Sequence, residues 1–183
     1  MPAVYNPSIE SIRERFDILG LPDSNKAKIG ERLYHLFAQK FDPSHHYHSL
    51  FEQTLKLSNI GKVLTIYHKD RHASYIAMQE LNYGFSHQEM VLISLLLYTK
   101  TKRGYHKALY KEYRSLLPSK KCVKWLAFLY SLTLILHKAS AKTVPQFTYR
   151  KDRLIIRSHS SLYLAREDIT LMKKPKGLKI ILE

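Results

Sequence analysis

The segment SHQEMVLISLLLYTK, residues 86–100, carries the strongest structural signals in this chain. Ser86, followed three residues later by Glu89, forms a capping box, and this pattern predicts that a helix starts at the serine. Residues 90–97 are apolar on nearly every side of that helix. Because a helix without a polar face has to be covered by other elements, we expect it at the centre of a helical fold.

Apolar residues recur at helical spacing on both sides of this segment. Asn6 and Pro7 form a typical helix start, since asparagine can cap a helix and proline at its first position loses no needed donor. Further helices are predicted around residues 29–37, 50–60, 70–81, 105–116 and 118–138. The chain up to residue 140 is therefore predicted to be helical.

The pattern changes after residue 140. Short runs rich in β-branched and aromatic residues predict strands at 146–150, 153–158 and 177–182. Between the second and third runs, one face of a predicted helix holds Leu162, Ala165, Ile169 and Met172. We therefore predict a mostly α fold, with a helical domain over residues 1–140 and a small α+β subdomain over residues 141–183.

The composition indicates an anionic partner. The 183 residues include 30 Lys and Arg against 15 Asp and Glu, which gives a formal charge of +15. Nucleic acid, polyphosphate, nucleotides and anionic membranes all suit such a charge, although a basic surface can also serve solubility alone. Between residues 100 and 124 nine basic residues meet a single acid, and three of them, Lys107, Lys111 and Arg114, share one face of the predicted helix 105–116. This face is a candidate for binding an anion.

Common enzyme motifs are missing from the sequence. It contains no HExxH pair, no zinc spacing of Cys and His, no G-x-S-x-G elbow and no glycine loop that would cradle phosphates. An ATPase or a dinucleotide-dependent enzyme is therefore disfavoured. His45, His46 and His48 lie close together, but no carboxylate motif accompanies them, and we expect a loop exposed to water.

The cysteine content and the apolar runs bear on the compartment. Cys122, the one cysteine, lies in an apolar run, so we expect a small buried side chain and no intramolecular disulfide, which fits a reducing compartment. The N-terminus has no apolar signal core. The most apolar stretch, residues 125–136, is too short for a bilayer of about 30 Å. These features predict a cytoplasmic protein without a membrane partner.

Three parts of the chain resemble a known family: NPSIESIRERFDI at 6–18, the run from Leu57 to Lys102, and the basic helices that follow. The most specific parts are RHASYI at 71–76 and LNYGFSHQE at 81–89. Their order and spacing resemble the C-terminal half of the exopolyphosphatase / guanosine pentaphosphate phosphohydrolase family. In that family this half is a helical domain related to HD-type phosphohydrolases, whereas the other half carries the phosphatase site. The resemblance therefore implies an HD-like helical bundle over residues 1–140.

The resemblance also implies that this domain has lost its metal ligands. Where the family often keeps a His and an acidic residue, this chain has Ser58 and Asn59, and where it commonly has Tyr-His, this chain has Tyr98 and Thr99. At the position of the final Asp of HD enzymes the chain reads LILHKAS, residues 134–140. Hydroxyl and amide groups bind a divalent metal poorly compared with imidazole and carboxylate. We therefore expect no catalytic residue, no metal and no cofactor.

Basic residues remain around these positions. The resemblance implies that they form the rim of a pocket that binds polyphosphate or a guanosine polyphosphate. The domain would then be the C-terminal domain of such a phosphatase, acting as a non-catalytic binding or regulatory module that binds one of these ligands or docks on a separate phosphatase partner. A homodimer is also implied, since members of the family tend to be dimeric. Together with the basic face of helix 105–116, the candidate anion-binding residues are Lys62, His68, Lys69, Arg71, His72, Lys100, Lys102, Arg103, Lys107, Lys111 and Arg114.

Three other functions stay open. A divergent metal-dependent HD phosphohydrolase would bind Mn, Fe or Mg at a site that the sequence does not reveal. A domain that binds RNA or another nucleic acid would use the same positive charge, and its 13 tyrosines could stack on bases, although most of the aromatic residues sit at the spacing of core positions. A purely structural or dimerisation role would use the apolar helices alone.

Overall fold

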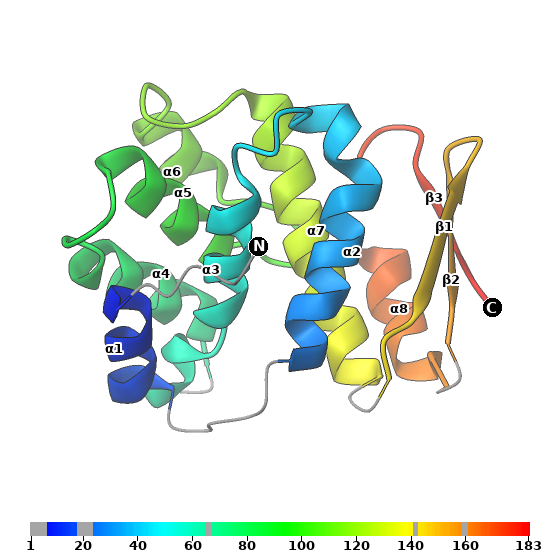
Figure 1. Ribbon diagram of the computed structural model, residues 1–183, viewed down its shortest axis with the longest axis horizontal. Coiled ribbons are helices and arrows are strands. Elements are labelled where there is room, and N and C mark those ends of the chain that lie inside the picture. The colour runs from blue at the N-terminus through cyan, green and yellow to red at the C-terminus, as the bar shows by residue number, and fades with distance from the viewer. Residues whose placement is uncertain (1–6, 18–23, 65–66, 141–142, 159–160) are drawn as a thin grey trace.

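The computed structural model describes residues 7–17, 24–64, 67–140, 143–158 and 161–183 (Figure 1). Up to residue 140 the elements are α1 (Pro7–Phe16), α2 (Ser24–Phe41), α3 (His48–Lys56), the 3₁₀ turn η1 (Ile60–Val63), α4 (Lys69–Glu80), α5 (His87–Leu97), α6 (Lys107–Glu112) and α7 (Lys120–Ala139). Beyond it lie β1 (Gln146–Arg150), β2 (Arg153–Arg157), α8 (Tyr163–Leu171) and β3 (Lys179–Leu182). The predicted mostly helical fold with a small α+β end is confirmed.

Helices α5 and α7 form the apolar centre of the helical body. The predicted capping box is present: Glu89 N donates to Ser86 Oγ (3.3 Å), and Ser86 N donates to a carboxylate oxygen of Glu89 (2.8 Å). Every residue from Val91 to Leu97 is buried, and so are most residues of α7. Helix α7 packs along α2, and α5 packs against α4 and α3 (Figure 1). The apolar sides of α5 are therefore covered as the sequence predicts.

Helix α7 is long and apolar enough to cross a membrane, judged by length and composition alone. Core helices of globular proteins share these properties, since they too are covered on all sides. In this chain 72% of the most apolar window of α7 is buried against other parts of the same fold. Burial in the core thus accounts for the hydropathy of this helix.

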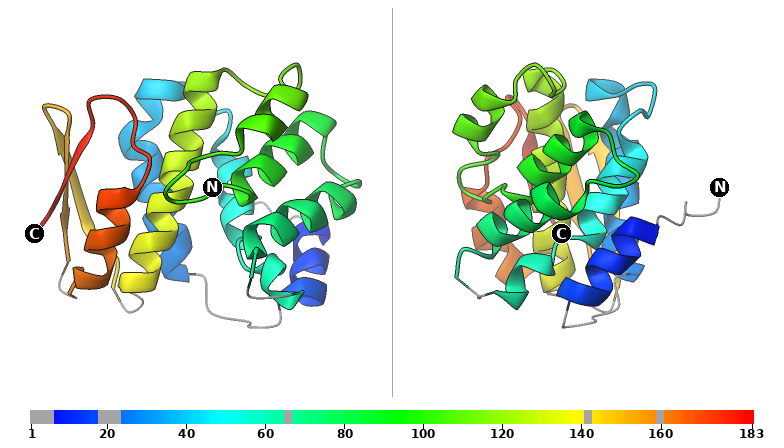
Figure 2. Two further views of the ribbon diagram at one scale, coloured as in Figure 1. Left: turned by 180° about the vertical axis from the view of Figure 1, so that it is seen from behind. Right: turned by 90° about the vertical axis from the view of Figure 1, so that its left-hand side faces the viewer.

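The C-terminal residues form a three-stranded sheet in the order β1-β2-β3. Strands β1 and β2 pair antiparallel, and β3 joins β2 in parallel after the chain has crossed over through α8. In Figure 2 the sheet stands at one end of the molecule, and α8 lies beside α7. Leu154 and Ile156 of β2, with Ala165 and Ile169 of α8, belong to the same buried cluster as residues of α2 and α7. One core therefore joins the helical body to the α+β end.

The region around α6 differs from the prediction. The helix expected over residues 105–116 is shorter, because α6 ends at Glu112 and residues 113–116 form turns. The backbone leaves the helical conformation at Tyr113 (φ −104°, ψ +25°), whereas Pro118 disfavours the helical conformation only at Leu117. Asn6, the predicted cap of α1, lies outside the described residues.

The histidine segment after α2 is less exposed than the sequence predicts. Asp42 is buried and accepts hydrogen bonds from the Tyr34 hydroxyl and from the backbone N–H of His46 (3.0 Å). This anchor folds the segment back against α2. As a result, the imidazoles of His45 and His48 are half-buried and pack on the Tyr34 ring, at centroid distances of 6.0 and 5.0 Å. His46 remains exposed, as expected.

Candidate anion-binding cavity

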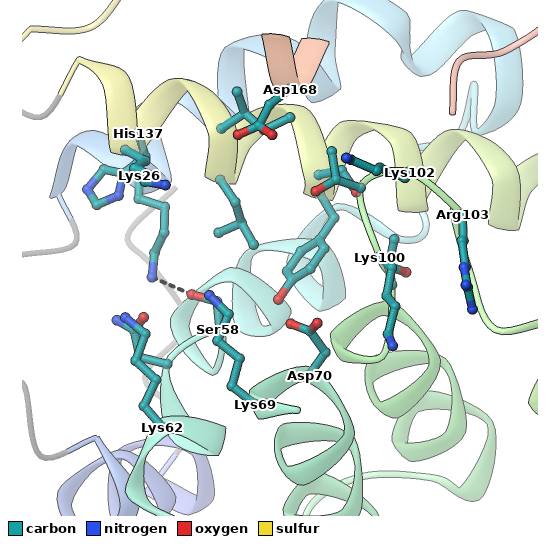
Figure 3. A pocket seen from close by; sticks show the side chains of 18 of the residues that line it. Lys26, Ser58, Lys62, Lys69, Asp70, Lys100, Lys102, Arg103, His137 and Asp168 are labelled. Atoms are coloured by element: carbon teal, nitrogen blue, oxygen red, sulfur yellow. Dashed lines mark hydrogen bonds between the residues drawn. The ribbon is translucent and has the colours of Figure 1, made fainter. Parts of the chain in front are cut away.

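A cavity of about 890 Å³ lies where distant parts of the chain meet (Figure 3). The first turn of α2, the segment from Ser58 to the start of α4, residues 99–103, the C-terminal half of α7 and the middle of α8 all contribute to its wall. The cavity therefore depends on the tertiary fold as a whole, including the small α+β end.

The lining of the cavity is strongly cationic. Among the described residues that line it, seven are lysine or arginine, and two, Asp70 and Asp168, are acidic. The imidazoles of His68 and His137 also line it. Because like charges gathered in one space repel each other, an anion with several charges would relieve this repulsion on binding. The seven cations are Lys26, Lys62, Lys69, Lys100, Lys102, Arg103 and Lys138.

Lys26 supplies a buried cation. It lies in the first turn of α2, and its side chain is 2% exposed. Its Nζ donates a hydrogen bond of 2.7 Å to Ser58 Oγ, which Figure 3 shows as a contact between α2 and the segment before η1. An ammonium group loses most of its hydration on such burial and needs polar partners or an anion nearby. The bond thus fixes one positive charge in the cavity wall.

Gly61 allows η1 to approach α4 closely. A Cβ atom at this position would lie 1.9 Å from the Lys69 carbonyl oxygen and 2.6 Å from the Ala73 nitrogen. No side chain can replace the glycine unless one of the two segments shifts. This close approach brings Ser58 and Asn59, which precede η1, beside the first turn of α4, and both segments line the cavity.

Residues 100–104 form a tight turn that carries three of the seven cations. Lys100 and Gly104 exchange backbone hydrogen bonds, from Lys100 N to Gly104 O (3.1 Å) and from Gly104 N to Lys100 O (2.7 Å). Gly104 has a φ of +70°, in the left-handed region that favours glycine. Lys173 N donates to Thr101 O (3.0 Å), which ties the turn to the segment after α8. The three cations are therefore presented by a turn that is held in place.

Asp70 is an acid within this cationic lining. Burial raises the pKa of its carboxyl group, and the nearby charges of Lys69, Lys100 and His68 only partly oppose this effect. The charge of Asp70 adds to burial in raising the pKa of the Tyr130 hydroxyl, which lines the same cavity. A carboxylate with a raised pKa takes up a proton more readily, so the cavity gains positive charge as the pH falls.

All eleven residues predicted to bind an anion lie in described parts of the chain, and the cavity brings together six of them. Arg71 and His72 are on α4 but do not line the cavity. Lys107 and Lys111 are on α6 and Arg114 follows it, and these three do not line the cavity either. The six predicted residues that do line it are Lys62, His68, Lys69, Lys100, Lys102 and Arg103.

Two lining cations, Lys26 and Lys138, are absent from the sequence prediction. Lys26 lies three residues before Ile29 and seven before Leu33, so it is in phase with the apolar stripe of α2. A lysine at an apolar position of the helix was the signal in the sequence that could have identified Lys26 as a buried cation. Lys138 lies in the last turn of α7, where the helix end carries a partial negative charge that favours cations.

The positions at which the resemblance implies lost metal ligands lie at this same cavity. Ser58 and Asn59, Thr99, and His137 from the segment 134–140 all line it. Within the described residues, no group of three or more His, Cys, Asp or Glu side chains is arranged to hold a metal ion. What the cavity offers is a set of hydrogen-bond donors and fixed positive charges, which suits an anion.

Comparison with known proteins gives no family assignment: no protein-family model matches the chain, and no curated protein matches its sequence. The site therefore has to be interpreted from its own chemistry.

Proposed function

We propose that this chain is a non-catalytic binding module for condensed phosphates, either linear polyphosphate or a guanosine polyphosphate, and that the cavity is its binding site. The observation that carries the proposal is the composition of the lining. Among the described residues that line the cavity of about 890 Å³, seven are lysine or arginine and only two are acidic. The proposed fold class is an HD-like helical bundle, of the kind implied by the resemblance to the exopolyphosphatase / guanosine pentaphosphate phosphohydrolase family.

Condensed phosphates suit this lining because their charges are closely spaced. A chain of phosphates can contact lysines from several segments at once, as the arrangement around the cavity requires. The Arg103 guanidinium can bind two phosphate oxygens as a fork, and the lysine ammonium groups act as point charges. The cavity volume also lies within the range of about 300–1,000 Å³ that is usual for small-molecule sites.

A binding role is favoured over hydrolysis by the groups at the positions of the implied metal ligands. Ser58, Asn59 and Thr99 supply hydroxyl and amide groups, and the Lys26 ammonium is bonded to Ser58. A fixed ammonium repels a divalent cation and attracts a phosphate oxygen. The domain would therefore hold phosphate chains for a separate phosphatase domain that hydrolyses them.

Charge reversal at matched sites tests the proposal. Lys69→Glu combined with Lys100→Glu reverses two cations of the cavity, and Lys107→Glu combined with Lys111→Glu makes the same charge change on α6, outside the lining. We expect the cavity variant to bind polyphosphate at least about tenfold more weakly than the wild type. The α6 variant should lose much less affinity, because exposed charges at a distance are screened by salt. Isothermal titration calorimetry measures both, and wild-type affinity should fall steeply with added salt.

Two controls complete this experiment. Circular dichroism establishes that both variants are folded, and a phosphate-release assay with added divalent metal measures turnover. Equal losses of affinity in the two variants would contradict the cavity as the site and favour the basic face of α6. Release of phosphate by the wild-type chain would contradict the non-catalytic role.

A further inference from the structure

The N-cap and one exposed face of α4 carry cationic and aromatic side chains. Arg71 and Tyr75 are four residues apart on α4, so they share one side of the helix. His68 directly precedes the helix as its N-cap, with a left-handed φ of +57°. His68 lines the cavity, and Arg71 and Tyr75 are exposed. We call these three residues the α4 stripe. Its two helical members, Arg71 and Tyr75, lie about 6 Å apart along the helix axis.

Two tyrosines close in sequence to the cavity residue His68 are exposed to solvent. Tyr75 is 63% exposed, and Tyr67, which directly precedes His68, is 80% exposed. A single exposed aromatic side chain is normal on a protein surface. Here two of them lie close in sequence to a residue of a cation-lined cavity, and their rings offer flat surfaces on which a base can stack. These two are therefore not among the aromatic residues that pack in the core.

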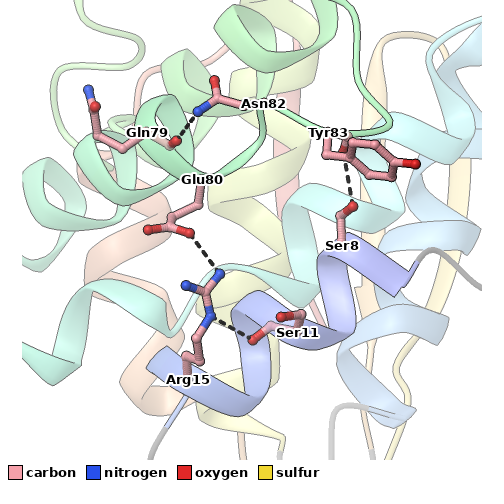
Figure 4. Close-up of polar contacts among 7 residues, drawn as sticks. All are labelled: Ser8, Ser11, Arg15, Gln79, Glu80, Asn82 and Tyr83. Atoms are coloured by element: carbon pink, nitrogen blue, oxygen red, sulfur yellow. Dashed lines mark hydrogen bonds and ion pairs between the residues drawn. The ribbon is translucent and has the colours of Figure 1, made fainter.

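The acidic residues of α4 do not neutralise the positive charge of the stripe. Asp70 lines the cavity, where lysines outnumber it. Glu80, near the far end of the helix, forms an ion pair of 2.7 Å with Arg15 of α1 (Figure 4). Because this pair offsets the charge of Glu80, the acid at the far end of α4 repels an approaching anion less. The stripe thus combines a cation and a tyrosine in a region that tolerates negative charge.

We propose that the cavity and the α4 stripe together bind single-stranded nucleic acid, with backbone phosphates in the cavity and bases stacked on Tyr75 and Tyr67. This inference rests on the proposed function, because the cavity must bind phosphates, and it adds a ligand class that has aromatic bases. Proteins that bind single strands combine a cationic path for the backbone with aromatic side chains for the bases. Linear polyphosphate has no bases and gains nothing from the tyrosines.

Competition between two polyanions tests this inference. Fluorescence anisotropy follows a short labelled oligouridine on the full chain at fixed salt, and linear polyphosphate of equal phosphate number serves as the probe without bases. We expect Tyr75→Ala to bind the oligouridine about tenfold more weakly and polyphosphate as tightly as the wild type. Tyr75→Phe keeps the ring and should bind both as the wild type does. Tyr163→Ala removes a tyrosine of α8 that is 78% exposed and should change neither affinity.

Each outcome separates this inference from the proposed function. If polyphosphate binds in the cavity and Tyr75→Ala binds the oligouridine as the wild type does, the stacking inference is overturned while the phosphate site stands. If neither polyanion binds, both proposals fail. A duplex that binds as tightly as the single strand would also overturn the inference, because paired bases cannot reach the faces of the tyrosine rings.

Discussion

Lys26 Nζ donates a 2.7 Å hydrogen bond to Ser58 Oγ, a residue 32 positions further along the chain. The bond joins the first turn of α2 to the segment before η1 and holds a buried ammonium group in the wall of the cavity. Under the proposed relationship to the exopolyphosphatase / guanosine pentaphosphate phosphohydrolase family, this same segment would be the place of a lost metal site. A fixed ammonium keeps a positive charge there but cannot lower the pKa of a bound water as a metal ion does. This relationship connects the fold to the proposed binding role.

Replacing Lys26 by methionine separates the charge of this residue from its packing. The variant Lys26→Met keeps a long unbranched side chain and removes the ammonium. We expect affinity for polyphosphate to fall about tenfold. The free energy of unfolding should stay equal or rise, because no buried charge then has to be desolvated. Calorimetry and urea denaturation measure the two quantities. A variant that binds as the wild type but unfolds more easily would show that Lys26 serves the fold alone.

Asp70→Asn removes a charge that burial disfavours. The pKa of Asp70 in the folded chain is raised above its ordinary value of 3.8, because burial favours the protonated carboxyl group. The protonated group therefore contributes fully to the stability of the fold below pH 3.8, and this contribution is lost as the pH rises through the folded pKa. The variant should therefore be more stable than the wild type at neutral pH, and this difference should vanish in acid. It should also bind polyphosphate more tightly at neutral pH. Urea denaturation across the pH range measures the stability, and a variant less stable at neutral pH would mean that neighbouring lysines favour the ionised form.

Gly61→Ala tests the close approach of η1 and α4. The added Cβ would overlap the Lys69 carbonyl oxygen, so the two segments have to separate. We expect a loss of about 1–3 kcal/mol in the free energy of unfolding. Phosphate affinity should fall as well, because both segments line the cavity. Thermal melting and calorimetry measure these losses, and an unchanged melting temperature would argue against the packing of these two segments.

Cys122 should be unreactive in the native chain. Burial, with a smaller contribution from the charge of Asp42, raises the pKa of its thiol to about 12. Since the thiolate is the reactive species, a thiol reagent should modify the residue only after unfolding. Modification followed with and without urea measures this difference. Rapid reaction without denaturant would contradict the buried position of α7 at this residue.

Local signals in the sequence predict much of the fold. The start of α5 at Ser86 follows from a capping box that involves residues three positions apart. The predicted strands begin and end within two residues of β1, β2 and β3, because alternation and turn residues are also local features. The predicted end of α6 was wrong, and no local pattern accounts for it, because Pro118 restricts only Leu117 and not the residues just after Glu112.

The cavity depends on contacts that no local pattern encodes. The run of basic residues at 100–103 correctly predicted part of the lining, whereas the neighbouring basic residues at 107–114 lie outside it. Lys26 is a single cation in an apolar stripe, and only the packing of α2 against other segments brings it to Ser58. The bond from Lys173 to Thr101 likewise joins segments far apart in the chain. For the same reason the spacing of Tyr75 could not show that its ring is exposed.

A crystal structure of the chain with bound tripolyphosphate tests the central claim most directly. We expect density for the phosphate chain inside the cavity, with its oxygens within hydrogen-bond distance of lysines such as Lys69 and Lys100. Phosphate bound along α6 beside Lys107 and Lys111, with the cavity left empty, would contradict the assignment of the cavity as the binding site.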